Sequence, residues 1–176
     1  MTESEDQILV RRALHADPAS FNELCQRYYN SLIAVADSIL LDKHLAEDAA
    51  QESLAEACRQ LGKLKKPELF GPWVCAICRN VANDMLRKIL REQKFANANS
   101  ANRKDSIEDD QKMILTEALK QLPQHLREVV FLRFYNEKSY QQMSEILGVT
   151  EQAIDGRLRR AKKNIADFLE RKGFRR

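Results

Sequence analysis

The sequence has 176 residues, of which 44% are hydrophobic and 31% are charged. That length suits one ordinary domain or two small ones, and this hydrophobic content is enough for packed cores. Only 5 Gly and 4 Pro are present, which argues against a turn-rich all-β protein. No apolar run approaches the roughly 18 residues of a membrane-spanning helix, and the acidic start is unlike a signal peptide. We therefore expect a cytoplasmic protein without membrane insertion.

The positive charge is unevenly distributed along the chain. The net charge is only +3, yet from position 157 to the end basic residues strongly outnumber acidic ones. Positive charge that gathers at one end of a nearly neutral chain is typical of a nucleic-acid-binding surface. A merely solvated helix usually mixes the two signs more evenly.

Apolar residues in the first half recur every three or four positions, which predicts helices. The expected helices cover residues 5–16, 17–41, 45–61 and 72–94. Asp17 can cap the second helix, and Pro18 suits its first position, where a missing N–H is harmless. Residues 63–71 contain Pro67 and Gly71 and are expected to form a loop. No stretch in this half alternates with period two, so no strand is predicted.

Residues 95–111 are rich in Asn, Ser and charge and poor in apolar side chains. Such a segment cannot bury itself, so it is predicted to be a flexible linker. Helices are expected again over 112–122 and from Pro123 onward, where the run LREVVFLRF is apolar nearly all round and therefore buried. The predicted fold class is all-α, with two small helical domains at 1–94 and 112–176.

The stretch from Ser139 to Lys163 predicts two short helices joined by a tight turn. Ser139 and Gln142 can form a capping box, Gly148 can end the first helix in a left-handed conformation, and Thr150 can cap the second. Because the second helix has a basic outward face, this stretch is predicted to be a helix-turn-helix that reads a DNA major groove. The alternative is an ordinary helical hairpin with a solvated basic face.

Motifs in both halves carry a family resemblance. In the second half they are Leu122-Pro123, Arg127-Glu128-Val129, Leu132-Arg133, Ser139-Tyr140, Ile146-Leu147-Gly148-Val149 and Arg157-Leu158-x-Arg160-Ala161. In the first half they are Phe21-x-Glu23-Leu24, Arg27-Tyr28-Tyr29, Ala46-Glu47-Asp48, Gln51-Glu52, Phe70, Trp73, Arg79-Asn80 and Asp84-x-Leu86-Arg87. With both sets in this order, the chain resembles bacterial RNA polymerase sigma factors of the small extracytoplasmic-function (ECF) type.

The resemblance implies a function for each half. The first half resembles the family's region 2, which binds the polymerase clamp and the minus-ten promoter element. The second half resembles region 4, which binds the minus-thirty-five element. The implied partners are the clamp and flap regions of core RNA polymerase, promoter DNA and an anti-sigma factor. The implied function is promoter-specific initiation of transcription, without chemistry of the protein's own.

The resemblance also places three groups of site residues. The group expected to bind polymerase is Glu47, Asp48, Gln51 and Glu52, which share one helix face. The group expected to bind the melted minus-ten strand is Lys63, Leu64, Lys65, Lys66, Phe70, Trp73, Ile77, Asn80 and Arg87. The group expected in the recognition helix is Thr150, Gln152, Asp155, Gly156, Arg157, Arg159, Arg160 and Lys163.

These residue types suit the implied contacts, although some have a plainer interpretation. Lysines supply the positive charge that a single strand needs, and Asn80 can satisfy the polar edge of a flipped base. Asp155 can accept from a cytosine amino group but cannot donate to guanine. Gly156 costs about 1 kcal/mol within a helix, which indicates close backbone approach or simple tolerance. The acidic face can be merely solvated, and a lone Trp such as Trp73 is more often part of a core.

No cofactor, metal site or catalysis is expected. Cys75 and Cys78 form a C-x-x-C without a second ligand pair, so they are expected to be small buried hydrophobes. The three histidines, His15, His44 and His125, lie far apart in the sequence. A second functional hypothesis is a stand-alone helix-turn-helix regulator that binds duplex DNA and never contacts polymerase.

Overall fold

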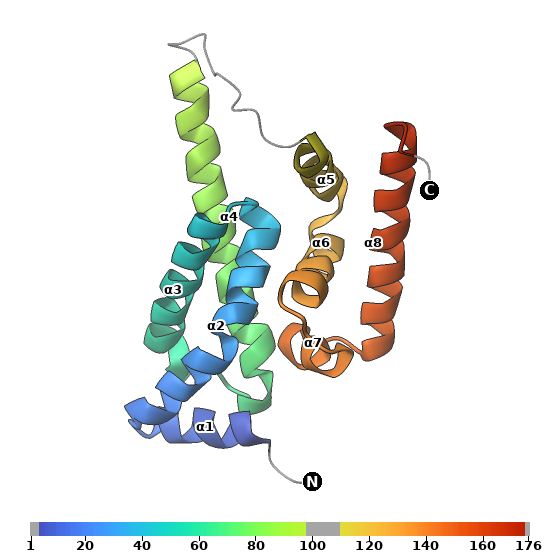
Figure 1. The fold of residues 1–176 in the computed structure, drawn as a ribbon. Helices are drawn as coiled ribbons and strands as arrows, with labels where there is room; N and C mark the ends of the chain where they lie inside the picture. Colours follow the sequence, from blue (N-terminus) through green and yellow to red (C-terminus); the bar gives the residue numbers. More distant parts are fainter. Residues whose placement is uncertain (1–3, 98–109, 175–176) are drawn as a thin grey trace.

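The computed structural model describes residues 4–97 and 110–174, and every regular element in these ranges is helical. Figure 1 shows two groups of helices side by side. The first helix group contains α1 (Glu5–Leu14), α2 (Pro18–Leu40), α3 (Lys43–Gln60), the 3-10 turns η1 (Leu61–Lys63) and η2 (Pro67–Leu69), and α4 (Phe70–Asn97). The second helix group contains α5 (Asp110–Gln121), α6 (Gln124–Val130), the π-helical turn η3 (Phe131–Tyr135), α7 (Tyr140–Leu147) and α8 (Glu151–Arg171). The predicted all-α fold class is confirmed.

Local side-chain caps define the start of the first helices. Ser4 Oγ accepts from the backbone N–H of Gln7, and the Gln7 side chain accepts from the N–H of Ser4, which forms a capping box for α1. At α2, Asp17 Oδ1 accepts from the N–H of Ala19 at 3.0 Å, and Pro18 takes the first helical position as predicted. The helix ends at Leu40, and the next residue, Leu41, caps it with a left-handed backbone at φ of 52°.

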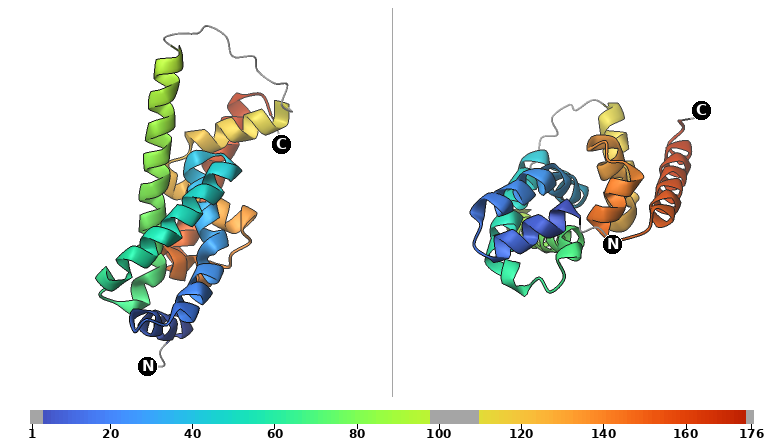
Figure 2. Two further views of the ribbon diagram at one scale, coloured as in Figure 1. Left: turned by 90° about the vertical axis from the view of Figure 1, so that its left-hand side faces the viewer. Right: turned by 90° about the horizontal axis from the view of Figure 1, so that it is seen from below.

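The first helix group is organised around α2, which packs against α1, α3 and α4 (Figure 2). Small buried residues such as Ala36, Ala49 and Ala50 allow α2 and α3 to approach closely. The α4 helix is 28 residues long, and its outward side is polar over much of its length. Within 4–97 and 110–174, no helix is both long enough and apolar enough to cross a bilayer.

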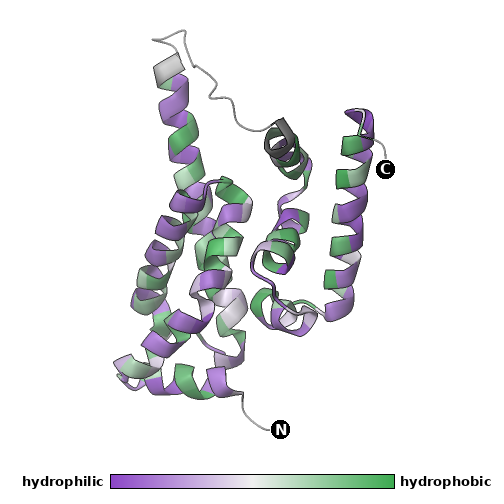
Figure 3. Cartoon of the chain, in the orientation of Figure 1, coloured by the Kyte–Doolittle hydropathy of each residue, from purple (hydrophilic) through white to green (hydrophobic). Residues whose placement is uncertain are grey.

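The second helix group contains the predicted helix-turn-helix. Ser139 and Gln142 form the expected capping box at α7, and Gly148 ends that helix with φ of 66°. Thr150 Oγ1 then accepts from the N–H of Ala153 at 3.2 Å and caps α8. The buried stripe of α8 consists of Ile154, Leu158, Ala161 and Phe168, and Figure 3 shows apolar and polar bands alternating along this helix. The local predictions for this motif are confirmed.

Three predicted boundaries need correction. The α4 helix begins at Phe70 rather than Pro72, because a proline is tolerated in the first turn of a helix. Helices also cover both ends of the predicted 95–111 linker, and the rest of that linker, 98–109, lies outside the described residues. The helix predicted from Pro123 changes to a π turn after α6, where the N–H of Asn136 donates to the carbonyl of Phe131 at 3.1 Å.

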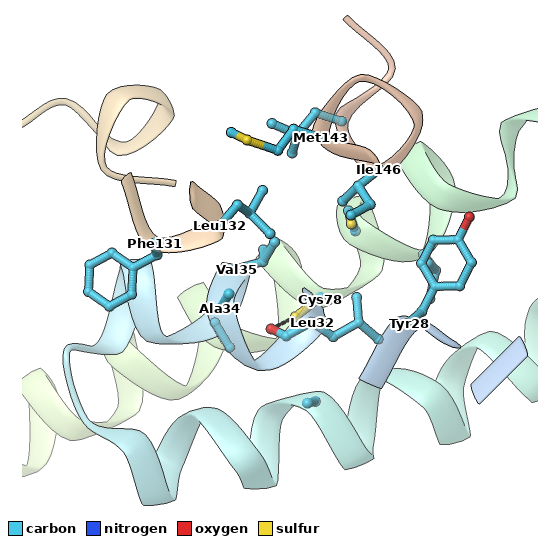
Figure 4. Close-up of a cluster of buried hydrophobic side chains, with 14 of the residues drawn as sticks. Tyr28, Leu32, Ala34, Val35, Cys78, Phe131, Leu132, Met143 and Ile146 are labelled. Atoms are coloured by element: carbon cyan, nitrogen blue, oxygen red, sulfur yellow. Dashed lines mark hydrogen bonds between the residues drawn. The ribbon is translucent and has the colours of Figure 1, made fainter. Parts of the chain in front are cut away.

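The two helix groups are packed against each other through one buried hydrophobic cluster. In Figure 4, Leu32 and Val35 of α2 and Cys78 of α4 lie close to Leu132 of η3, with Met143 of α7 on the far side. Each of these five residues is 0% exposed. The sequence indicated two helical domains but did not indicate that their cores are continuous.

Candidate nucleic-acid and polymerase interfaces

The predicted DNA-reading residues of α8 divide into exposed and half-buried sets. The exposed set is Thr150, Gln152, Arg159, Arg160 and Lys163, and the half-buried set is Asp155, Gly156 and Arg157. The exposed set includes three cations, and the opposite face of the helix is buried in the core. The structure therefore brings a cationic surface together on the outer side of α8.

Two of these side chains interact within the helix. Arg159 Nε donates to Asp155 Oδ2 at 2.8 Å, so the acceptor that Asp155 offers is already paired with a cation one turn later. Arg160 Nε donates to the carbonyl of Gly156 at 3.2 Å. A Cβ added at Gly156 would meet no atom within 4 Å, so nothing inside the described chain requires glycine there.

The predicted minus-ten loop combines exposed lysines with buried apolar residues. Lys63, Lys65 and Lys66 are exposed, whereas Leu64 is 8% exposed and Phe70 is 1% exposed. The Phe70 ring lies edge-on to the Tyr28 ring, with centroids 5.2 Å apart. Leu64 and Phe70 therefore belong to the core in this structure, and their contact with the melted minus-ten strand stays a prediction.

The remaining minus-ten residues are accessible along α4. Trp73 and Ile77 are half-buried and pack at the edge of the core, while Asn80 and Arg87 are exposed. The Trp73 ring contacts the Phe70 ring at a centroid distance of 5.9 Å, so Trp73 belongs in part to the core. Further along the helix lies a shallow cavity. Its lining includes three cations, Arg87, Arg91 and Lys94, and the exposed Leu90.

The predicted polymerase-binding residues gather on the outer face of α3. Asp48, Gln51 and Glu52 are exposed and Glu47 is half-buried. The inner face of the same helix is made of buried small residues, namely Ala46, Ala49, Ala50, Ser53 and Ala57. Gln51 Nε2 lies 3.5 Å from the Tyr29 hydroxyl, so Tyr29 adjoins the patch. We call Glu47, Asp48, Gln51 and Glu52 the α3 patch.

A cavity of about 420 Å³ lies beside this patch and was not predicted from the sequence. Its walls come from both helix groups: Tyr29, Asn30, Ile33, Ala34, Asp37, Lys43 and Glu47 on one side, and Phe131, Tyr135 and Asn136 on the other. Burial raises the pKa of Asp37, and the nearby charge of Asp42 raises it further. Residues so far apart in sequence give no local signal that they share a cavity.

An ion pair between the helix groups was also missed. Arg79 of α4 donates from Nε to Glu128 Oε1 of α6 at 2.9 Å, and the side chains are 27% and 5% exposed. Burial raises the pKa of Glu128 above its ordinary value, while the charges of Arg79, Arg157 and His125 act in the opposite direction. The one available signal was an acidic residue inside the apolar run LREVVFLRF.

The cysteines have the structural role that the sequence predicted. Cys75 and Cys78 are both 0% exposed, and burial raises the pKa of the Cys78 thiol to about 11. A thiol with such a pKa stays protonated and unreactive at neutral pH. Across the described ranges, no three His, Cys, Asp or Glu side chains are arranged so that they could hold a metal ion.

Both helix groups are similar to known proteins. The family model "Sigma-70 region 2" matches residues 24–92, and "Sigma-70, region 4" matches residues 112–165. The chain is 26% identical over 158 residues to the ECF RNA polymerase sigma factor SigM of Bacillus subtilis, covering 86% of this chain and 96% of that protein. It is 27% identical over 164 residues to the probable RNA polymerase sigma factor RfaY of Xanthomonas campestris pv. campestris. That second match covers 82% of this chain but only 41% of the relative.

A solved structure shares the fold. The sigma factor RpoE in complex with the anti-sigma factor NepR, from Bartonella quintana, matches with a TM-score of 0.55 at 23% identity. The match covers 85% of this chain and 96% of that chain.

A helical bundle followed by a helix-turn-helix, each matched by its own region model, defines a promoter-directing transcription protein. The chain belongs to the RNA polymerase sigma factors, of the ECF type. Sigma factors bind core RNA polymerase and promoter DNA and, as a class, are not enzymes. The region 2 match decides against a stand-alone helix-turn-helix regulator, because such a regulator would need only the second helix group.

Proposed function

We propose that this chain is a dissociable specificity subunit of bacterial RNA polymerase that acts in the cytoplasm. In this proposal residues 1–94 bind the clamp of the core enzyme and the melted minus-ten strand. Residues 112–176 bind the minus-thirty-five duplex and the flap, and residues 95–111 connect the two domains. The chemistry of RNA synthesis then belongs entirely to the core enzyme.

The observation that carries this proposal is the placement of two oppositely charged surfaces. The helix that carries the α3 patch and the helix that carries the cationic residues, α8, lie at opposite edges of the molecule (Figure 1, Figure 2). An acidic surface suits a basic protein partner, and a cationic helix suits the DNA backbone. Because the rest of the molecule separates α3 from α8, a protein and DNA can be bound without competing for space.

Capture of the melted minus-ten strand is proposed for the loop before α4 and the first turns of that helix. Lys63, Lys65 and Lys66 are exposed and can neutralise phosphates of a single strand. Asn80 is exposed on the same helix as the half-buried Ile77, so an amide and an apolar surface are both accessible to an unstacked base. Phe70 and Leu64 are buried beneath this surface and support it.

Reading of the minus-thirty-five element is proposed for the outer side of α8. Arg160 and Lys163 can hold phosphates, and Gln152 in the first turn can form a bidentate contact with adenine. The Asp155–Arg159 pair presents an acceptor and a donor together. For Asp155 to accept a hydrogen bond from a cytosine amino group, Arg159 would have to release Asp155 and turn toward the DNA.

An anti-sigma factor is the proposed regulator. The Bartonella quintana relative was solved in complex with an anti-sigma factor, and the chain shares its fold. A protein that covers the α3 patch or the outer side of α8 would prevent polymerase or promoter binding. That partner is proposed here on the basis of the shared family alone.

The decisive test is reconstitution with core RNA polymerase. The purified chain should form a stable complex with core enzyme and confer transcription from a cognate promoter. Asp48→Arg should weaken core binding at least tenfold, because it reverses a charge at the centre of the α3 patch. The matched control is Asp84→Arg, the same change at an exposed Asp of α4, whose side chain is 68% exposed. Wild-type chain that fails to bind core enzyme would refute the proposed function.

A further inference from the structure

The cavity of about 420 Å³ beside the α3 patch has the dimensions of a small-molecule site. Sites of that kind commonly enclose about 300–1,000 Å³. The lining comes from α2, α3 and the segment around the π turn η3, so most of it is held on helical elements rather than on a loop. A cavity with such a fixed lining can select a ligand by its chemistry.

Hydrogen-bond acceptors are prominent in the polar part of this lining. Asp37 of α2 and Glu47 of α3 each contribute a carboxylate. Within residues 4–97 and 110–174, neither carboxylate accepts a hydrogen bond or forms an ion pair. Asn136 lines the same cavity, and in the described part of the chain its buried Oδ1 has no hydrogen-bond partner. A buried acceptor is costly to leave unmatched, so this lining suits a ligand that donates hydrogen bonds.

The charges of the described lining favour a cation. Two carboxylates, Asp37 and Glu47, are accompanied by one ammonium group, that of the exposed Lys43. Burial raises the pKa of Asp37 and the charge of Asp42 raises it further, while Lys43 acts in the opposite direction. Burial has removed part of the water that would stabilise the ionised carboxylate of Asp37, and a cation in the cavity would take its place.

Aromatic rings form much of the apolar part of the lining. The rings of Phe131 and Tyr135 are stacked, with centroids 4.7 Å apart and planes inclined by 14°. Tyr135 is 59% exposed, so a ligand can reach its ring, and the half-buried Tyr29 faces the cavity from α2. The face of an aromatic ring attracts cations, and a planar guanidinium group can also stack on it.

We propose that this cavity binds a small organic cation that carries a guanidinium group. A guanidinium is planar, stays charged at neutral pH and has several N–H donors in one plane. These properties match the aromatic rings, the negative charge and the unmatched acceptors of the lining. A ligand with a second amino group at its other end can pair with both carboxylates.

Occupation of the cavity has a consequence for the α3 patch, because Glu47 belongs to both. A cation bound there neutralises the charge of this carboxylate. An acidic surface with less charge attracts a basic protein partner less strongly, so the ligand lowers the affinity of the chain for core polymerase. This consequence rests on the proposed function, whereas ligand binding itself does not.

Calorimetric titration of the free, full-length chain with agmatine tests the site. Agmatine carries a guanidinium group at one end and an amino group at the other. N-carbamoylputrescine has a neutral ureido group in place of the guanidinium and is the matched control compound. We expect agmatine to bind with one-to-one stoichiometry and at least about tenfold more tightly than the control. No binding of agmatine at millimolar concentration, or equal binding of the two compounds, would overturn the proposal.

Two pairs of variants locate the ligand in this cavity. Asp37→Asn removes a charge from the lining and should weaken agmatine binding at least about tenfold, whereas Asp84→Asn, the same change at an exposed position of α4, should not. Tyr135→Ala should weaken binding several-fold. Its control is Phe134→Ala, which removes an equally exposed ring outside the described lining. Equal losses in a variant and its control, with native helix content by circular dichroism, would overturn the site.

A core-binding assay tests the consequence for the α3 patch. Saturating agmatine should weaken binding of the wild-type chain to core enzyme several-fold. Asp37→Asn should bind core enzyme as wild type does, and agmatine should then have little effect. Unchanged core affinity of the agmatine-bound wild type would overturn this link.

Two other results of the same assay have distinct meanings. If Asp37→Asn binds core enzyme more weakly in the absence of agmatine, a polymerase side chain fills the cavity, and the small-molecule proposal is overturned. If the wild-type chain does not bind core enzyme at all, the proposed function fails. The calorimetric result still decides whether the cavity is a ligand site, because that titration contains no polymerase.

Discussion

The two helix groups achieve order in different ways. The first group relies on long helices, such as the 23-residue α2 and the 28-residue α4, that bury small and aromatic side chains along their sides. The second group contains the 7-residue α6 and the 8-residue α7, whose positions depend on caps, a left-handed glycine and a π turn. Lateral packing therefore determines the candidate sites of the first group, and turn geometry determines those of the second.

The largest expected effect tests lateral packing in the first group. Phe70→Ala removes a ring that is 1% exposed and contacts Tyr28 and Trp73, so it should lower the free energy of unfolding by about 3–5 kcal/mol. Denaturant titration followed by fluorescence of Trp73, the single tryptophan, measures the loss. Phe134→Ala is the matched control in the second group, where the residue is 54% exposed, and should change stability far less. Equal losses for the two variants would contradict this contrast.

A pair of glycines tests the dependence of the second group on its turn. Gly148→Ala places an alanine in a left-handed conformation with φ of 66° and brings its Cβ within 2.7 Å of Pro72. The free energy of unfolding should therefore fall by at least about 1–2 kcal/mol. Gly156→Ala, in open space within α8, should instead raise stability by about 1 kcal/mol. Thermal and denaturant unfolding of both variants measures the two signs. A loss of stability in Gly156→Ala would show that the open space is occupied.

The smallest expected effect concerns the joint between the groups. Burial raises the pKa of Glu128 above its ordinary value of 4.5, so the folded chain holds this proton more tightly than the unfolded chain. Its contribution to stability is therefore fully present below pH 4.5 and is lost as the pH rises through the raised pKa. Glu128→Gln, which does not titrate, should gain stability relative to wild type as the pH rises through that window. The opposite trend would show that the attraction of Arg79 outweighs the effect of burial.

The sequence predicted the second group in more detail than the first. Ser139, Gln142, Gly148 and Thr150 act on neighbours within a few positions, so their roles follow from local spacing. In the first group the loop lysines were correctly expected at the surface, but Phe70 was not expected in the core. Its burial depends on Tyr28, which lies 42 positions earlier in the chain and gives no local signal.

The sequence by itself determined the helices, their caps, the charged faces of α3 and α8, and the sigma factor family. These properties arise from side chains within one or two helical turns of each other, where spacing alone decides which groups meet. Only the tertiary structure decided that both groups share one core and that Arg79 pairs with Glu128. The Arg79–Glu128 pair joins residues 49 positions apart, and contacts of this kind depend on how whole surfaces fit together.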